Sequence, residues 1–162
     1  MIKKIKIKIV LFETIALIFI INGLQRLYVA SQGAKYDAIM SDNWEKFESL
    51  TTLTIGQFIA YRAIWTLIII LTGVLVIGYI NWKSKISIIN SILLFLLIIG
   101  ISVTGFFMKG IVNNYLNYFS GLFGETYGIP FFIGGTILTL IGITILWQTL
   151  SRHKKHYTQH QL

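Results

Sequence analysis

Residues 9–30 read IVLFETIALIFIINGLQRLYVA, and this stretch decides what kind of protein the chain can form. A helix needs about 20 mostly apolar residues to cross the hydrocarbon core of a bilayer. Three more runs reach that length, roughly at 58–80, 88–108 and 129–150. Backbone groups in lipid must be satisfied within the segment, so long runs without alternation predict helices rather than strands. We therefore expect an all-α membrane protein, a bundle of four antiparallel transmembrane helices.

The composition supports one membrane domain. Of 162 residues, 55% are hydrophobic and only 12% are charged, where a soluble domain would be about one-quarter charged. The chain has no cysteine, which excludes disulfides, thiolate metal sites and thiol catalysis. The basic start resembles a signal peptide, but no small-x-small cleavage pattern follows a short apolar segment. We expect the first helix to be retained.

Lysine and arginine gather at the N-terminal segment 1–8, the short turn 81–85 and the tail 151–162. An even number of spans places all three on one side, so the positive-inside rule predicts two cytoplasmic termini in the cell (inner) membrane. The net charge of +8 then indicates contact with anionic headgroups at the cytoplasmic face of the bilayer rather than with nucleic acid.

Two outer loops follow from this topology, at 31–57 and 109–128. In the first, Ser41 is a plausible N-cap for a short amphipathic helix at 42–52. This helix is expected to lie on the membrane surface or to cover a binding site as a lid. In the second, tyrosines and glycines predict a series of turns.

Small residues recur along the fourth run at i, i+4 and i+7, namely Gly135, Thr139 and Gly142. Such a stripe allows close helix contact, either within the bundle or between protomers.

Polar residues gather at the outer ends of the first two helices. They are Asn22, Gln25, Arg26, Gln57, Tyr61 and Arg62. The first three share one helix face, and Arg26 is expected near Arg62 at the same depth. One interpretation is anchoring at the outer headgroups. The other is a site for a ligand with a polar head and an apolar body, such as a quinone or a lipid, with the head held by Gln25, Arg26 and Tyr61.

Glu13 is an acidic residue inside the first run. It is expected to extend to the interface or to pair with Lys85 or Arg152; the alternative is a proton-accepting or ligand role. Nine residues separate it from Asn22, which places it on roughly the opposite face and outside the same site. No metal site and no catalytic constellation is expected, since the histidines lie in the tail, at His153, His156 and His160.

The motif Gly23-Leu24-Gln25-Arg26-Leu27, and the stretch 73–78 with the basic turn behind it, resemble the DoxX-like family of small four-helix membrane proteins. That resemblance implies an accessory role near quinone chemistry in a membrane redox complex, and it carries over only Gln25 and Arg26. The chain departs from the family in its long first outer loop and its lack of cysteine, so any thiol chemistry would belong to a partner.

Two other functions remain open. One is a non-enzymatic scaffold or partner-binding membrane module that packs against a larger protein through the glycine and threonine stripe. The other is a small transporter, for which the third and fourth runs offer almost no polar path.

Overall fold

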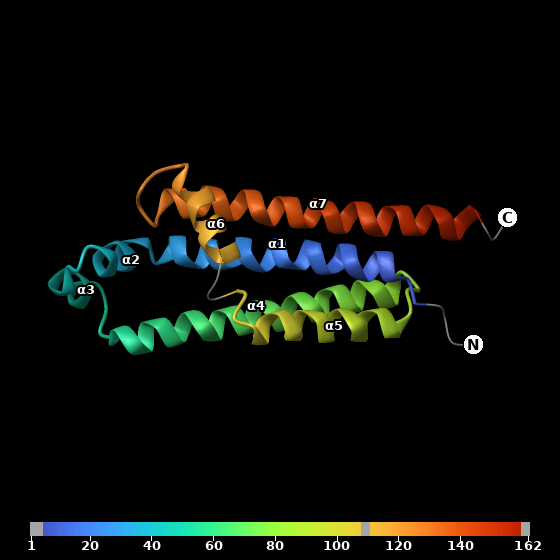
Figure 1. The fold of residues 1–162 in the computed structure, drawn as a ribbon, viewed down its shortest axis with the longest axis horizontal. Helices are drawn as coiled ribbons and strands as arrows, with labels where there is room; N and C mark the ends of the chain where they lie inside the picture. The colour runs from blue at the N-terminus through green and yellow to red at the C-terminus, as the bar shows by residue number, and fades with distance from the viewer. Residues whose placement is uncertain (1–4, 108–110, 160–162) are drawn as a thin grey trace.

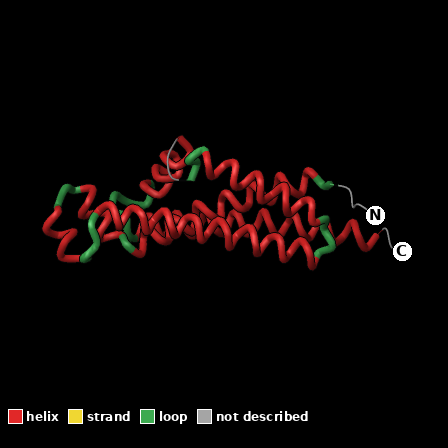
Figure 2. The backbone as a smooth tube through the Cα atoms, turned by 90° about the horizontal axis from the view of Figure 1, so that it is seen from below, coloured by secondary structure: helices red, strands yellow, loops and turns green. Residues whose placement is uncertain are grey.

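The computed structural model describes residues 5–107 and 111–159, and every regular element in these ranges is an α-helix (Figures 1 and 2). The helices are α1 (Ile7–Ser31), α2 (Gly33–Met40), α3 (Trp44–Leu50), α4 (Ile55–Lys83), α5 (Ile88–Val103), α6 (Ile111–Gly121) and α7 (Ile129–Gln159). Three of them, α1, α4 and α7, are long and apolar enough to cross a membrane. The predicted all-helical fold is thus confirmed, while the fourth span and the orientation stay predictions. Residues 1–4, Lys109 and His160 lie outside the described residues.

Helix α1 occupies the middle of the molecule, between α7 on one side and the hairpin of α4 and α5 on the other (Figure 1). The hairpin turns within 84–87, where Lys85 adopts a φ of 55° and the Ser87 side chain accepts a hydrogen bond from the amide of Ile89. This short turn makes α4 and α5 antiparallel neighbours, as predicted. The start of α1 and the end of α7 lie together at the end of the molecule opposite α3 (Figure 1).

Helix α5 is shorter than the predicted span at 88–108. Its 16 residues rise about 24 Å, less than the roughly 30 Å of a bilayer core. The helix stops because Gly105, after the C-cap residue Thr104, takes a left-handed φ of 76°. Phe107 is then buried in the core, while Met108 lies outside the described residues.

The outer segments contain more helix than predicted. Helix α3 confirms a short helix in the first loop, but its N-cap is Asn43, whose Oδ1 accepts from the amide of Lys46 at 3.0 Å. The Ser41 cap is wrong because Asp42 adopts a φ of 52° and delays the start of the helix. The second loop was expected to form turns, yet α6 occupies much of it.

The contact of α1 with α7 depends on residues without bulky side chains. A Cβ added at Gly23 would lie 2.7 Å from the carbonyl oxygen of Gly135, and one at Gly142 would lie 2.6 Å from that of Ala16. Backbone approach of this kind increases van der Waals contact, which drives helix association in lipid. The stripe predicted on the fourth run therefore packs within this chain.

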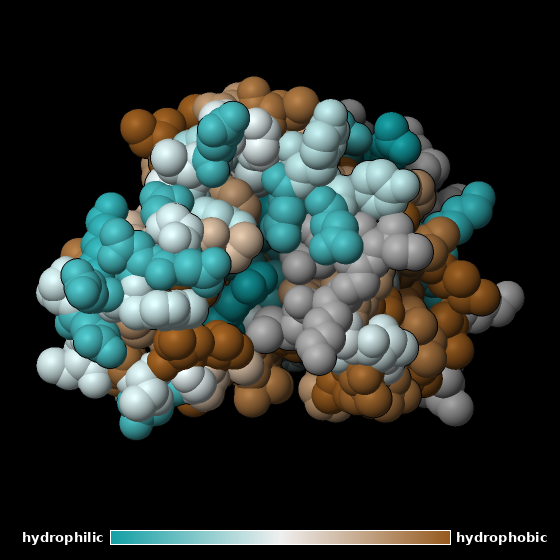
Figure 3. All heavy atoms as spheres, turned by 60° about the vertical axis from the view of Figure 1, so that its left-hand side comes forward, coloured by the Kyte–Doolittle hydropathy of each residue, from teal (hydrophilic) through white to brown (hydrophobic). Residues whose placement is uncertain are grey.

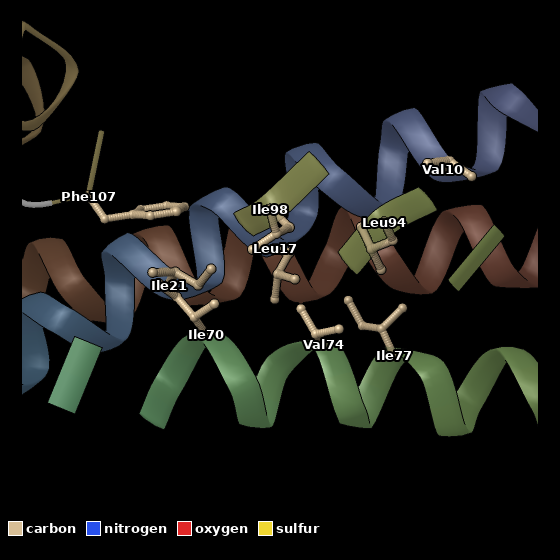
Figure 4. Close-up of a cluster of buried hydrophobic side chains, with 9 residues drawn as sticks. All are labelled: Val10, Leu17, Ile21, Ile70, Val74, Ile77, Leu94, Ile98 and Phe107. Atoms are coloured by element: carbon tan, nitrogen blue, oxygen red, sulfur yellow. The ribbon is translucent and has the colours of Figure 1, made fainter. Parts of the chain in front are cut away.

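An apolar cluster fills the space between α1, α4 and α5 (Figure 4). Its central members are Leu17, Ile21, Ile70, Val74, Ile77, Leu94 and Ile98. A hydrogen bond between polar side chains of α1 and α4 closes each end of this layer, from Gln25 Nε2 to Thr66 Oγ1 at 2.8 Å and from Asn81 Nδ2 to Glu13 Oε2 at 3.1 Å. Helix α1 is therefore held to α4 by two polar contacts with a dry layer between them.

Candidate functional site

The polar face of α1 is buried rather than exposed to headgroups. Asn22, Gln25 and Arg26 are 0%, 3% and 2% exposed. Arg26 donates from Nη1 to the backbone carbonyl of Asn22 at 3.0 Å, one turn earlier in its own helix. Because a charged group in an apolar interior is costly unless it is hydrogen-bonded, these bonds keep Arg26 inside the protein.

Helix α6 brings a second partner to Arg26. Arg26 Nη2 donates to Asn117 Oδ1 at 3.0 Å. Helix α6 lies across α1 beside the first turns of α7, where Ser120 is fully buried against Gly134 (Figure 1). A hydrogen bond to a charged group contributes about 1.5–3 kcal/mol, so Asn117 ties the second outer segment to α1.

A cavity of about 310 Å³ opens at this outer end. Its walls come from α1, α2, α4, α6 and the start of α7, and they are Val29, Tyr36, Ile39, Met40, Phe58, Ile59, Arg62, Asn117, Tyr127 and Phe131. Four of the ten wall residues are aromatic, and three of them form one group: the Tyr36 ring stacks on Tyr127 at 5.7 Å and lies 4.9 Å from the Phe58 ring. Figure 3 shows this end of the molecule, where hydrophilic side chains gather at the left and over the upper part, and hydrophobic ones lie along the lower edge and at the right. Such a mixture suits a ligand with a flat or apolar body and a polar head.

Two polar groups on the cavity wall are buried beside each other. Neither the Tyr36 hydroxyl nor Arg62 Nε has a hydrogen bond of good geometry, but the hydroxyl lies close enough to the Arg62 side chain to interact with it. Burial raises the pKa of Tyr36 to about 12, although the charge of Arg62 acts in the opposite direction. The phenol therefore stays protonated, so the cavity presents an O–H and an N–H donor.

The structure brings some of the expected site residues together and separates others. Arg62 lines the cavity, and its charge is close enough to repel that of Arg26, as the shared depth predicted. Gln57 is exposed and forms a capping box with Thr54 at the start of α4. Tyr61 is 48% exposed, and neither it nor Gln57 lines the cavity.

Gln25 also does less than expected at the cavity. Its side-chain nitrogen donates to Thr66, which in turn donates to the Arg62 carbonyl at 2.9 Å. Gln25 thus fixes the register of α1 against α4 and positions the turn that carries Arg62.

Sequence reasoning missed the contributions of Tyr36 and Asn117. Tyr36 lies on α2, a short helix that contains no apolar run in the sequence. Asp37 holds this helix in place, because its Oδ1 accepts a hydrogen bond from the Tyr127 amide at 2.8 Å. Asn117 lies on α6, where apolar and polar residues alternate with helical spacing. That periodicity was the available signal for a helix in the second outer segment.

Glu13 lies at the other end of α1, and the expectation that it extends to the interface is wrong. Its side chain is fully buried, and its partner is the Asn81 amide. Glu13 is separate from the outer site, as expected. The separation comes from distance along α1 and not from a different helix face. Glu13 and Gln25 both bond to α4, and 12 residues of helix, about 18 Å, separate them.

A second cavity, of about 820 Å³, lies where the start of α1 faces the end of α7. Apolar residues such as Phe12 and Ile145 line it together with Lys6, Lys8 and Arg152. His153 also lies here, and its Nδ1 is 3.1 Å from Lys6 Nζ. His153 is thus part of a packed helix end rather than a frayed tail, while nothing is described of the His156 side chain.

Comparison with known proteins adds no relative. Neither the scan against family models nor the searches of curated proteins and of solved structures finds a match to this chain.

Proposed function

We propose that the protein is a four-span membrane protein of the cell membrane whose outer cavity binds an amphiphile with a hydrogen-bond-accepting head. The observation that carries this proposal is the pair of buried donors, Tyr36 Oη and Arg62 Nε, which lie beside each other on the wall of a cavity with four aromatic side chains. A quinone matches it best, because its carbonyl oxygens accept hydrogen bonds and its ring stacks on aromatic side chains. A phospholipid headgroup shares the acceptor chemistry but lacks the ring.

The proposed topology places both termini in the cytoplasm. The described charges that support it lie at one end of the molecule, where α1 begins, α4 turns into α5 and α7 ends. Lys6, Lys8 and Arg152 border the groove at that end, where contact with anionic headgroups is favourable. Helix α5 would complete its crossing with the residues that follow it, since its helical part alone is too short.

The quinone proposal agrees with the resemblance to the DoxX-like family and with an accessory role in a membrane redox system. The contacts differ from those that the resemblance implied. Arg62 and Tyr36 would hold the head, while Gln25 and Arg26 would position the elements around it. The alternative of a partner-binding module would need a surface other than the glycine stripe, which α1 covers.

A transporter is not favoured. The buried polar groups lie at two ends of α1, and the apolar layer of Leu17, Ile21, Ile70 and Val74 separates them. A polar solute would have to cross this dry layer.

Quinone binding can be measured by quenching of tryptophan fluorescence with a short-chain ubiquinone analogue, using protein in nanodiscs. We expect Tyr36→Phe and Arg62→Gln to weaken binding about tenfold or more, because each removes one donor to the head. Tyr61→Phe is the matched control, since it also deletes a phenol hydroxyl at this end but lies off the cavity.

Equal binding by wild type, Tyr36→Phe and Arg62→Gln would overturn the site. The lipid alternative is tested by extraction of co-purified lipid from the same variants. Loss of one phospholipid class in Arg62→Gln, without any quinone-dependent quenching in the wild type, would assign the cavity to a lipid headgroup instead.

A further inference from the structure

A carboxyl group that the proposed ligand site does not use lies buried between α1, α4 and α5. The Glu13 side chain is 0% exposed, and so is that of Asn81, whose Nδ2 donates to Glu13 Oε2 at 3.1 Å. The same amide nitrogen lies 3.3 Å from Ser91 Oγ on α5. Three helices therefore meet around one carboxyl–amide pair.

Each member of this pair has one oxygen without a partner. Glu13 Oε1 and Asn81 Oδ1 are both buried and make no hydrogen bond. Two acceptor oxygens without a donor are costly in an apolar interior, and an ionised carboxylate there costs more. Neither oxygen can satisfy the other while Glu13 is charged, because both only accept.

One proton removes both deficits. A neutral carboxyl group carries one O–H donor and keeps one acceptor, and an amide offers one of each in the same plane. Asn81 Nδ2 is already bonded to Oε2, so a hydrogen on Oε1 that bonds to the Asn81 oxygen would close a cyclic acid–amide pair. We propose that Glu13 and Asn81 form a buried proton-binding site, with the carboxyl group neutral and donating from Oε1 to Asn81 Oδ1.

The described cations at this end lie at the end of α4, on the turn after it and along the groove between α1 and α7. Lys83 lies over the Tyr79 ring at 5.0 Å, and Lys85 is exposed in the turn after α4. On the α7 side, the basic groups line the groove between α1 and α7, namely Lys6, Lys8, Arg152 and His153. Glu13 does not line that groove.

Removal of the proton would leave two buried acceptor oxygens, Glu13 Oε1 and Asn81 Oδ1, without a donor, and a negative charge in an apolar interior. The site therefore couples proton binding to the packing of α1 against the α4–α5 hairpin. This inference is independent of the outer cavity, so quinone binding can fail while the proton site stands.

The protonation state is tested by the infrared spectrum of the intact protein near neutral pH. We expect the carbonyl band of a protonated carboxylic acid, present in wild type and lost in Glu13→Gln. Glu48→Gln is the matched control, because it removes an exposed carboxyl group and should leave the band in place. A wild-type spectrum without this band, or a band that survives in Glu13→Gln, would overturn the proposal.

Thermal unfolding gives a second test. Glutamine mimics the neutral acid, since its amide can donate to Asn81 Oδ1 and accept from Nδ2, so Glu13→Gln should melt within about 2 °C of wild type. Glu13→Ala leaves the Asn81 oxygen without a donor and its amide nitrogen with only the 3.3 Å bond to Ser91, so it should melt roughly 5 °C lower. If Glu13→Gln loses as much as Glu13→Ala, or if replacing sodium by choline lowers the wild-type melting temperature, the pair holds an ionised carboxylate with a cation rather than a proton.

Discussion

Gly23 is the residue on which the contact of α1 with α7 depends most directly. A side chain there would meet the Thr139 side chain and the backbone of Gly135. The Gly135 backbone cannot rotate away, so Gly23→Ala should destabilise the protein by about 1–3 kcal/mol. Thermal unfolding in detergent measures this change.

Gly78 supplies the control, because a Cβ there meets nothing within 4 Å and the residue is also helical. Gly78→Ala should be neutral or stabilising by up to about 1 kcal/mol, as alanine is the better helix former. Equal losses in Gly23→Ala and Gly78→Ala would mean that helix flexibility, not close contact, determines the effect.

Tyr36 should make stability fall in alkaline solution. Its folded pKa is about 12 and its ordinary pKa is 10, because burial disfavours the phenolate. Above pH 10 the unfolded chain loses this proton while the folded chain keeps it, so the stabilisation is complete below pH 10 and is lost as pH rises towards 12. Comparison of wild type with Tyr36→Phe isolates the effect. The variant should lack about 1–3 kcal/mol of this alkaline loss, and identical pH profiles would contradict it.

At single positions, the sequence predicts which polar residues are unusual better than it predicts their hydrogen-bond partners. It identifies Asn22, Gln25, Arg26 and Arg62 as unusual, and the structure buries the first three and places Arg62 on a cavity wall. Their partners come from segments with no strong local signal, as with Asn117, 91 residues from Arg26. Residues this far apart in the sequence cannot be identified as partners from their spacing.

Among the elements, α6 is the one whose position controls the outer site. It is docked through Ser120, which is fully buried against Gly134. Ser120→Leu should dislodge α6, because the added atoms would enter the backbone of α7. We expect faster amide exchange in α6 and weaker ligand binding. Tyr118→Leu is the control on the same helix, since Tyr118 is 73% exposed and should tolerate the change.

Element boundaries follow from the sequence where apolar length decides them, as for α1, α4 and α7. Predicted boundaries are wrong where a single residue ends a helix. Gly105 ends α5 early through its left-handed backbone, and this glycine lies inside an otherwise continuous apolar run. Helix α2 escapes prediction because it is short and contains no apolar run, whereas α6 has a helical periodicity but only 11 residues, so both depend on docking for their stability.

For the molecule as a whole, the absence of cysteine makes the proposed topology testable. A single cysteine at Ser49, exposed on α3, should react with a membrane-impermeant maleimide in intact cells. A cysteine at Ser84, in the turn after α4, should react only after the membrane is opened. The reverse pattern would mean that the topology is inverted. Labelling of both cysteines from outside would mean that the turn after α4 lies on the same side of the membrane as α3.

The central position of α1 has a consequence for how the protein is made. Its closest packing is with α7, which leaves the ribosome after α4 and α5. Until α6 and α7 have been made, Arg26 lacks Asn117 and the glycine face of α1 stays open. A chain truncated before α7 should therefore be degraded by proteases rather than persist as a smaller stable domain.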